Sequence, residues 1–278
     1  MRSLRGWGFF NMQHRLDATF ARLKAAQEGA LVTFVTAGDP SIEGTPALVA
    51  ALAASGADIV EIGIPYSDPL ADGPSIQMSS QRALEAGVTP DTVLQMVRDI
   101  RTHTEVPIVL MTSYNLALKY GLERFAHIFA EAGADGAILT DLPPEEAAPW
   151  KAAAEKHGIS TIFLIAPTST PERIALIAKN TTGFIYCVSR TGVTGTRSEL
   201  PPELQALLSR IRSASDKPIC VGFGVSRPEH VTQVIKNADG AVIGSALVDF
   251  LHETDGKPGQ MGELDGLVRS WKAATRGT

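Results

Sequence analysis

The chain has 278 residues, a net charge of −5 at pH 7 and a sequence pI of about 5.7, which argues against a general nucleic-acid-binding protein. Hydrophobic residues make up 44% and charged residues 20%, as expected for a soluble globular protein. No apolar stretch reaches the roughly 20 residues of a membrane span, and residues 1–15 lack the apolar core of a signal peptide. We therefore expect a cytoplasmic protein that binds neither nucleic acid nor membranes.

Short apolar runs alternate along the chain with longer helical segments. The runs, each too short for a helix and bounded by Gly, Pro or polar residues, are Leu31–Thr36, Ile59–Ile64, Pro107–Met111, Gly136–Thr140, Thr161–Ile165, Phe184–Val188, Pro218–Gly222 and Ala241–Gly244. The helical segments include Thr45–Ser55, Ser75–Glu85, Asp91–His103, Leu122–Ala132, Pro144–His157, Pro171–Lys179, Pro201–Ala214 and Pro228–Asn237. Strands that alternate with helices predict a parallel sheet, and eight units in a chain of this length favour an α/β fold closed into a (β/α)8 TIM barrel over an open doubly wound sheet.

The two ends of the chain depart from this repeat. The amphipathic segment Arg15–Ala26 is expected to cap the bottom of the barrel as an N-terminal helix. Residues 253–262 are polar and rich in Gly and Pro, which predicts a surface loop before a last helix. The sequence therefore predicts an N-terminal extension, residues 1–14, and a single barrel domain, residues 15–278.

Glu61 is the most informative residue, because it lies within the apolar run Ile59–Ile64. Side chains alternate along a strand, so Glu61 points to one face while Val60, Ile62 and Ile64 point to the other. If the aliphatic face packs on outer helices, Glu61 points into the barrel near its C-terminal mouth, where barrel enzymes carry their active sites. A structural carboxylate paired with Arg or Lys is the alternative. We favour an acid–base role, since burial raises the pKa of a carboxyl group.

The loop that follows this strand carries two more acids, Asp68 and Asp72, between Pro65, Pro69 and Pro74. Aspartate beside Pro and Gly commonly makes a turn or caps a helix. Asp68 is interpreted as structural. For Asp72 the sequence position leaves a helix cap and a chemical role equally open.

Three successive strand ends are rich in glycine. They are Ser189–Thr196, Gly222–Ser226 and Gly244–Ala246, the last of which begins a helix. Loops after the seventh and eighth strands of barrels commonly bind phosphate, because glycines let the backbone approach and a helix N-terminus supplies N–H groups. Ordinary tight turns are the alternative, but three in succession favour a phosphate site.

Metal and nucleophile chemistry find little support. Cys187 and Cys220 lie in strand-like runs and are expected to be reduced core residues. No His/Cys cluster has zinc spacing, so we predict no metal. None of the six histidines follows a strand, which argues against a Ser-His-Asp hydrolase. The residues alone predict a phosphate-binding barrel enzyme with a carboxylate pair.

Three segments resemble the tryptophan synthase α subunit family, over a chain length from about Arg15 to the C-terminus. They are Phe34–Pro40, the long and specific Glu61–Gln77, and Ser189–Gly195. The resemblance implies cleavage of indole-3-glycerol phosphate to indole and D-glyceraldehyde 3-phosphate by a retro-aldol step, a lyase reaction of tryptophan biosynthesis. It implies that Glu61 is the general acid and that Asp72 stabilises the charge at the indole N–H, which raises Asp72 above the capping alternative.

The resemblance also implies the remaining site residues. Phosphate would be bound at Gly195, Gly224, Gly244 and Ser245, and the rest of the substrate would lie near Phe34, Tyr186, Thr194 and Phe223, with Thr194 on a loop that closes over the ligand. Two features depart from the family pattern: Ser113 stands where a tyrosine is usual, and residues 1–14 match nothing.

The family works as a complex, which implies a β subunit partner in an α2β2 heterotetramer. The partner would carry pyridoxal phosphate, and this chain would carry no cofactor. The loop Pro65–Pro74 and the segment after the third strand would form much of the contact. Two alternatives stay open: a stand-alone lyase that releases free indole, and a catalytically silent binding or regulatory barrel, which the intact acids and glycines disfavour.

Overall fold

A computed structural model describes residues 14–70, 72–188, 200–222 and 224–276. Its strands are β1 (Ala30–Thr36), β2 (Ile59–Gly63), β3 (Ile108–Thr112), β4 (Gly136–Leu139), β5 (Ser160–Ile162), β6 (Leu164–Ile165), β7 (Ile185–Val188), β8 (Ile219–Gly222) and β9 (Gly240–Ile243). The pairings between these strands are parallel, in the order β5-β4-β3-β2-β1-β9-β8-β7-β6. Because β5 and β6 are consecutive parts of one segment, that segment joins the two ends of the sheet, and the predicted (β/α)8 barrel is confirmed.

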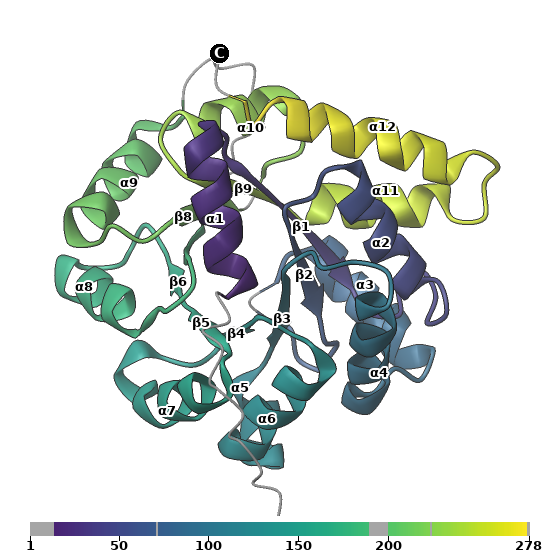
Figure 1. The fold of residues 1–278 in the computed structure, drawn as a ribbon, viewed down its shortest axis with the longest axis horizontal. Coiled ribbons are helices and arrows are strands. Elements are labelled where there is room, and N and C mark those ends of the chain that lie inside the picture. Colours follow the sequence, from purple (N-terminus) through teal and green to yellow (C-terminus); the bar gives the residue numbers. More distant parts are fainter. Residues whose placement is uncertain (1–13, 71, 189–199, 223, 277–278) are drawn as a thin grey trace, which may run out of the picture.

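Helices surround this ring of strands (Figure 1). They are α1 (Arg15–Ala26), α2 (Thr45–Ser55), α3 (Pro74–Glu85), α4 (Pro90–Arg101), α5 (Tyr114–Tyr120), α6 (Leu122–Ala132), the 3-10 turn η1 (Pro144–Glu146), α7 (Ala148–His157), α8 (Pro171–Asn180), α9 (Pro202–Ala214), α10 (Pro228–Ile235), α11 (Ser245–Thr254) and α12 (Gln260–Ala273).

The structure differs from the sequence-based elements in several places. The predicted fifth strand is interrupted at Phe163, where the segment exchanges its β4 partner for β7 and the Phe163 carbonyl accepts from the Tyr186 N–H at 3.1 Å. The predicted helix Pro144–His157 is divided into the 3-10 turn η1 and helix α7. Pro149 lacks an N–H and therefore suits the first turn of α7. Helix α5 was not predicted, and the predicted loop at residues 253–262 is shorter, since α11 ends at Thr254 and α12 begins at Gln260.

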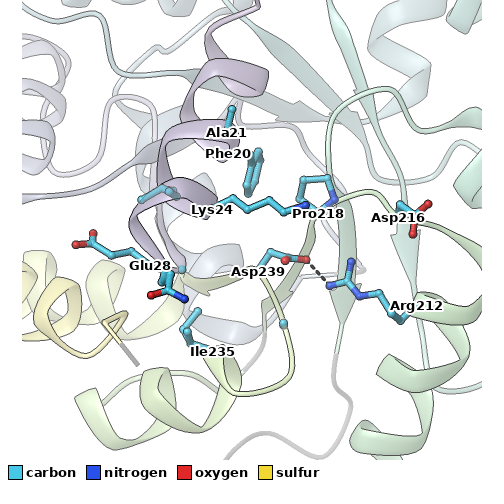
Figure 2. Close-up of a pocket in the computed structure, with 13 residues that line it drawn as sticks. Phe20, Ala21, Lys24, Glu28, Arg212, Asp216, Pro218, Ile235 and Asp239 are labelled. Atoms are coloured by element: carbon cyan, nitrogen blue, oxygen red, sulfur yellow. Dashed lines mark hydrogen bonds and ion pairs between the residues drawn. The ribbon is translucent and has the colours of Figure 1, made fainter. Parts of the chain in front are cut away.

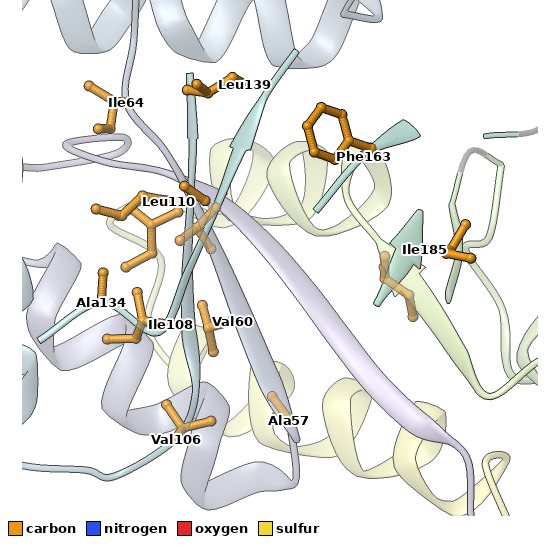
Figure 3. Close-up of a cluster of buried hydrophobic side chains, with 14 of the residues drawn as sticks. Ala57, Val60, Ile64, Val106, Ile108, Leu110, Ala134, Leu139, Phe163 and Ile185 are labelled. Carbon is orange, nitrogen blue, oxygen red and sulfur yellow. The ribbon is translucent and has the colours of Figure 1, made fainter. Parts of the chain in front are cut away.

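Side chains alternate between two cores, as the strand period requires. Val60, Ile62 and Ile64 belong to the outer core between sheet and helices, part of which Figure 3 shows. Ile59 belongs to the inner core of the barrel. Cys187 is buried in the outer core and Cys220 in the inner one, and both are free, which confirms their prediction as core residues.

Helix α1 closes the bottom of the barrel, the end at which the strands begin. Its Leu16 and Leu23 are buried within the inner core, and Figure 1 shows the helix lying across the ring. The expected cap is therefore confirmed. The proposed extension at residues 1–14 falls almost wholly outside the described residues and stays a prediction.

Three aspartates at the bottom link neighbouring strands. Each aspartate directly precedes a strand, and its backbone N–H donates to the carbonyl of a residue at the start of the neighbouring, earlier strand. The N–H of that same residue donates in return to the aspartate carboxylate. The pairs are Asp58 with Leu31, Asp135 with Ile108 and Asp239 with Ile219, at 2.8–3.0 Å. Each carboxylate also forms ion pairs with one or two basic side chains.

Candidate active site

Glu61 lies in the interior of the barrel. On β2 it is in register with Phe34 of β1 and Val109 of β3, on the same face as the inner-core residue Ile59. Its side chain is 1% exposed, and neither carboxyl oxygen has a hydrogen-bond partner among the residues described. Burial raises the pKa of Glu61 to about 8. The group is therefore mostly protonated at neutral pH and can donate a proton.

Phe34 lies beside Glu61 at the end of β1. Its ring packs over Gly63, where an added Cβ would lie only 2.7 Å from the Phe34 Cζ. Glycine at this position is what allows the ring to turn inward across β2. The structure thus places an aromatic surface next to the buried acid.

Tyr186 faces the same interior from β7. The side chain is buried in the inner core, and its ring centroid lies 6.3 Å from that of Phe184. Burial raises its pKa well above the usual value, and the charges of Glu61, Cys220 and Asp72 raise it further. Tyr186 also lines a cavity together with Gly73, the residue after Asp72, so the structure brings Tyr186 and the loop that carries Asp72 together.

Asp72 lies on the loop between β2 and α3. The N-cap of α3 is Gly73, with no side-chain capping bond, so the structure does not place Asp72 in a capping position. The side chain is half-buried, and burial raises its pKa to about 6. Asp68 differs: it is exposed and accepts a hydrogen bond from the neighbouring Ser67 hydroxyl at 2.6 Å.

A cavity of about 280 Å³ lies beside these groups. Its lining includes Gly73, Tyr186, Gly224, Gly244 and Ser245. Since α11 begins at Ser245, the free N–H groups of a helix N-terminus border the cavity, and such groups bind anions. Two of the predicted glycine turns are therefore brought together with Tyr186.

Three predicted site residues, Thr194, Gly195 and Phe223, lie outside the described residues. Sequence reasoning missed Tyr66, whose hydroxyl lies 3.3 Å from the Thr140 hydroxyl. Burial and the charges of Asp72 and Asp141 raise its pKa. Its place in the same loop as Asp72 was the available signal. Asp249 was also missed: it borders the 280 Å³ cavity from α11.

The described part of the chain contains no group of three or more His, Cys, Asp or Glu residues placed to hold a metal ion. Among the same residues, no helix is long and apolar enough to cross a bilayer.

Comparison with known proteins gives a consistent family. The family model "Tryptophan synthase alpha chain" matches residues 20–276. The chain is 54% identical over 234 residues to the protein of that name from Geobacter sulfurreducens, covering 84% of this chain and 89% of that one. It is 48% identical over 258 residues to the protein of that name from Geobacter sp. strain M21, covering 93% and 96%.

Solved structures agree in fold. The tryptophan synthase subunit alpha of Legionella pneumophila is 40% identical, with a TM-score of 0.87 over 95% of this chain and 98% of that one. A chain of tryptophan synthase from M. tuberculosis is 36% identical, with a TM-score of 0.86 over 95% and 99%. With the match extending along nearly the whole barrel, the chain belongs to the tryptophan synthase alpha chain family.

Proposed function

We propose that this barrel cleaves indole-3-glycerol phosphate to indole and D-glyceraldehyde 3-phosphate, with Glu61 and Asp72 as the catalytic residues. The reaction is that of its family, a lyase step of tryptophan biosynthesis. The roles of individual residues rest on the geometry of the site.

The observation that carries the proposal is the state of Glu61. A buried carboxyl group without a hydrogen-bond partner in the described structure lowers the stability of the fold. A catalytic role explains why such a group is present. A pKa of about 8 keeps the proton on Glu61 at neutral pH, as a general acid requires. Protonation of indole C3 removes the need for a carbanion leaving group.

One carboxyl group can then complete the cycle. As C3 accepts the proton, positive charge develops at the indole nitrogen, where an ionised Asp72 stabilises it. The Glu61 carboxylate next takes the proton of the C3′ hydroxyl while the C3–C3′ bond breaks, which releases the aldehyde and indole. Glu61 ends protonated, as it began, so no further acid or base is needed.

The phosphate end of the substrate would lie in the 280 Å³ cavity at Gly224, Gly244 and Ser245. The N-terminus of α11 supplies the N–H groups that an anion needs. Gly195 and Thr194, from the glycine-rich stretch after β7, are proposed to close this cavity over the ligand, and Phe34, Tyr186 and Phe223 to contact the remainder of the substrate.

An exposed apolar surface beside the active site supports the proposal of a β subunit partner. Leu70 is 88% and Met78 56% exposed, and both lie next to the loop that carries Asp72. A surface cavity of about 320 Å³ lined by Tyr66, Pro69 and Met78 lies in the same place. Apolar patches of this kind mark protein interfaces. We propose an α2β2 complex in the cytoplasm, with pyridoxal phosphate in the β subunit and no cofactor in this chain.

The test is steady-state lyase activity with and without a cognate β subunit. We expect at least a tenfold rise, a coupling of about 1.4 kcal/mol, because docking would order the Asp72 loop near Glu61. Met78→Asp should abolish the rise. Met261→Asp is the matched control, since Met261 is 49% exposed on α12 and should not affect it. Full activity of the isolated chain would favour the stand-alone lyase instead, and no activity in either state would favour a silent barrel.

A further inference from the structure

Helix α3 determines where Asp72 lies. The helix begins at Pro74, two residues after Asp72. Gln77 in its first turn donates a side-chain hydrogen bond to the Asp72 backbone oxygen at 2.8 Å. The last part of the catalytic loop is therefore fastened to the helix, so a displacement of α3 displaces Asp72.

Two polar contacts anchor α3 to the end of β1. Arg82 donates from Nε and from one terminal nitrogen to the two oxygens of Asp39, at 2.8 and 2.7 Å. The hydroxyls of Ser79 and Thr36 are 2.6 Å apart and buried. Ser79 and Arg82 are three residues apart and so share one face of the helix, which restrains both sliding and rotation of α3.

The pair between Asp39 and Arg82 differs from an ordinary surface salt bridge. Asp39 is buried and Arg82 is largely covered. A planar guanidinium that binds a carboxylate through two parallel bonds fixes direction as well as distance. At the other end of α3, Ile76 lies against the phosphate turn, since a Cβ on Gly244 would meet the Ile76 Cδ1 at 3.7 Å.

We propose that Arg82 is a positioning residue for the reaction: through its bidentate bond to Asp39 it holds α3, and with it Asp72, where the Asp72 carboxylate stabilises charge at the indole nitrogen while Glu61 protonates C3. The inference rests on the proposed function of Asp72. In the described structure Arg82 is not among the residues that line the 280 Å³ cavity, and its hydrogen-bond partner is Asp39 rather than Glu61 or Asp72.

The sharpest variant is Asp39→Asn, which removes the ionic partner and leaves the Arg82 charge in place. The Arg82 charge also interacts with Asp249 on the border of the proposed phosphate cavity. Because Asp39→Asn retains this charge, a fall in kcat can be attributed to the position of α3 and not to a changed charge near the phosphate. Arg82→Lys is the second variant, because it keeps the charge but loses the two-pronged geometry. Arg269→Gln is the matched control: Arg269 also contacts both oxygens of an aspartate, Asp265, but on the exposed surface of α12.

The measurements are kcat for indole-3-glycerol phosphate cleavage and the dissociation constant for glycerol 3-phosphate, both referred to the folded fraction from circular dichroism. A misplacement of about 1 Å can cost about a hundredfold in rate, so we expect Asp39→Asn and Arg82→Lys each to lower kcat at least fivefold. Affinity for glycerol 3-phosphate should stay within twofold. The double variant should be no slower than the slower single variant, because both break the same contact.

Unchanged kcat in both variants, with only a lower melting temperature, would show that the pair is purely structural and would overturn the proposal. A comparable loss of kcat in Arg269→Gln would overturn it too. If the wild-type chain has no lyase activity, with or without the β subunit, the proposed function fails and the inference falls with it. Active wild type with insensitive variants removes the inference alone.

Discussion

The acidic residues at the two ends of the barrel have opposite surroundings. At the bottom, each of three carboxylates accepts a hydrogen bond from a backbone N–H and forms an ion pair with at least one basic side chain. They are Asp58, Asp135 and Asp239. Asp239, for example, forms an ion pair with Arg212, and both residues line a cavity of about 450 Å³ (Figure 2). At the mouth, Glu61 has no partner among the described residues, and burial raises the pKa of both Glu61 and Asp72.

The difference separates acids that hold the fold from acids that are available for chemistry. The carboxylates at the bottom hold neighbouring strands together, because each accepts a backbone N–H and forms an ion pair with a basic side chain. A carboxyl group buried without donors stays protonated near neutral pH and can give its proton away. Substitutions of the acids at the bottom should therefore reduce the free energy of unfolding and leave kcat nearly unchanged. Substitutions of the acids at the mouth should reduce kcat and leave the fold intact.

Glu61→Gln should give the largest effect. The amide keeps the shape of the side chain but cannot donate a proton. General acid–base catalysis is worth about 10²–10⁴-fold, and Glu61 would serve in both steps, so we expect kcat to fall at least a thousandfold. The check is single-turnover cleavage of indole-3-glycerol phosphate, with glycerol 3-phosphate affinity as the control for an intact site. Retention of half the wild-type rate would end the assignment.

Asp135→Ala should show the reverse pattern at the bottom. It removes the ion pairs to Arg101 and Arg15, at 2.6 and 3.0 Å, and the bond to the Ile108 N–H at 2.8 Å. Arg101 is largely buried, and an uncompensated buried charge costs about 3–5 kcal/mol. We expect a loss of this size in the free energy of unfolding, measured in urea, with kcat of the folded enzyme within twofold. A large loss of kcat would erase the distinction between the two ends.

Asp72→Asn tests whether the second acid at the mouth is chemical. We expect kcat to fall about a hundredfold, because an amide cannot stabilise positive charge at the indole nitrogen. Asn is a good helix cap, so a capping role would leave activity and stability unchanged. Asp68→Asn is the matched control, since Asp68 is exposed on the same loop. Equal activities of the two variants would speak against Asp72.

The sequence predicted most of the arrangement because it depends on local patterns. The period of two along β2 was enough to turn Glu61 inward, and burial then follows from barrel closure. What it could not predict depends on contacts distant along the chain. Tyr66 gains its neighbour Thr140, the residue after β4, only when the strands assemble. The contact between Asp39 and Arg82 joins residues 43 positions apart. The interruption at Phe163 likewise depends on which strands flank it.

Gly244→Asp should weaken phosphate binding without altering the acids. A Cβ at Gly244 would meet Ile76 and Phe34 at ordinary contact distances of 3.7 Å, so Gly244→Ala is a fair steric control. The added carboxylate repels an anion at the N-terminus of α11. We expect affinity for glycerol 3-phosphate to fall about tenfold in Gly244→Asp and at most threefold in Gly244→Ala. Equal affinities in both variants and wild type would place the phosphate elsewhere.

The last and smallest effects concern pH. The proposed mechanism needs Asp72 ionised, above its pKa of about 6, and Glu61 protonated, below its pKa of about 8. The kcat/KM of the free enzyme should therefore rise through pH 6, fall through pH 8 and change several-fold within one unit beyond each limit. Asp72→Asn should lose only the acidic limb. A profile that is flat from pH 5 to 9 would contradict both assignments.

The free energy of unfolding should also depend on pH through Glu61. The sign follows from the pKa values of Glu61 in the folded and unfolded states. The pKa of Glu61 in the folded barrel, about 8, exceeds the value of 4.5 for an unperturbed glutamate, so the folded state binds the proton more tightly. The resulting stability is fully present below about pH 4.5 and is lost as pH rises through 8. Since Gln does not titrate, the free energy of unfolding of Glu61→Gln should gain on that of wild type over this window, as measured by urea denaturation at pH 5, 7 and 8.5. A constant difference would mean that Glu61 is not held neutral in the folded barrel, which would contradict its assignment as the general acid.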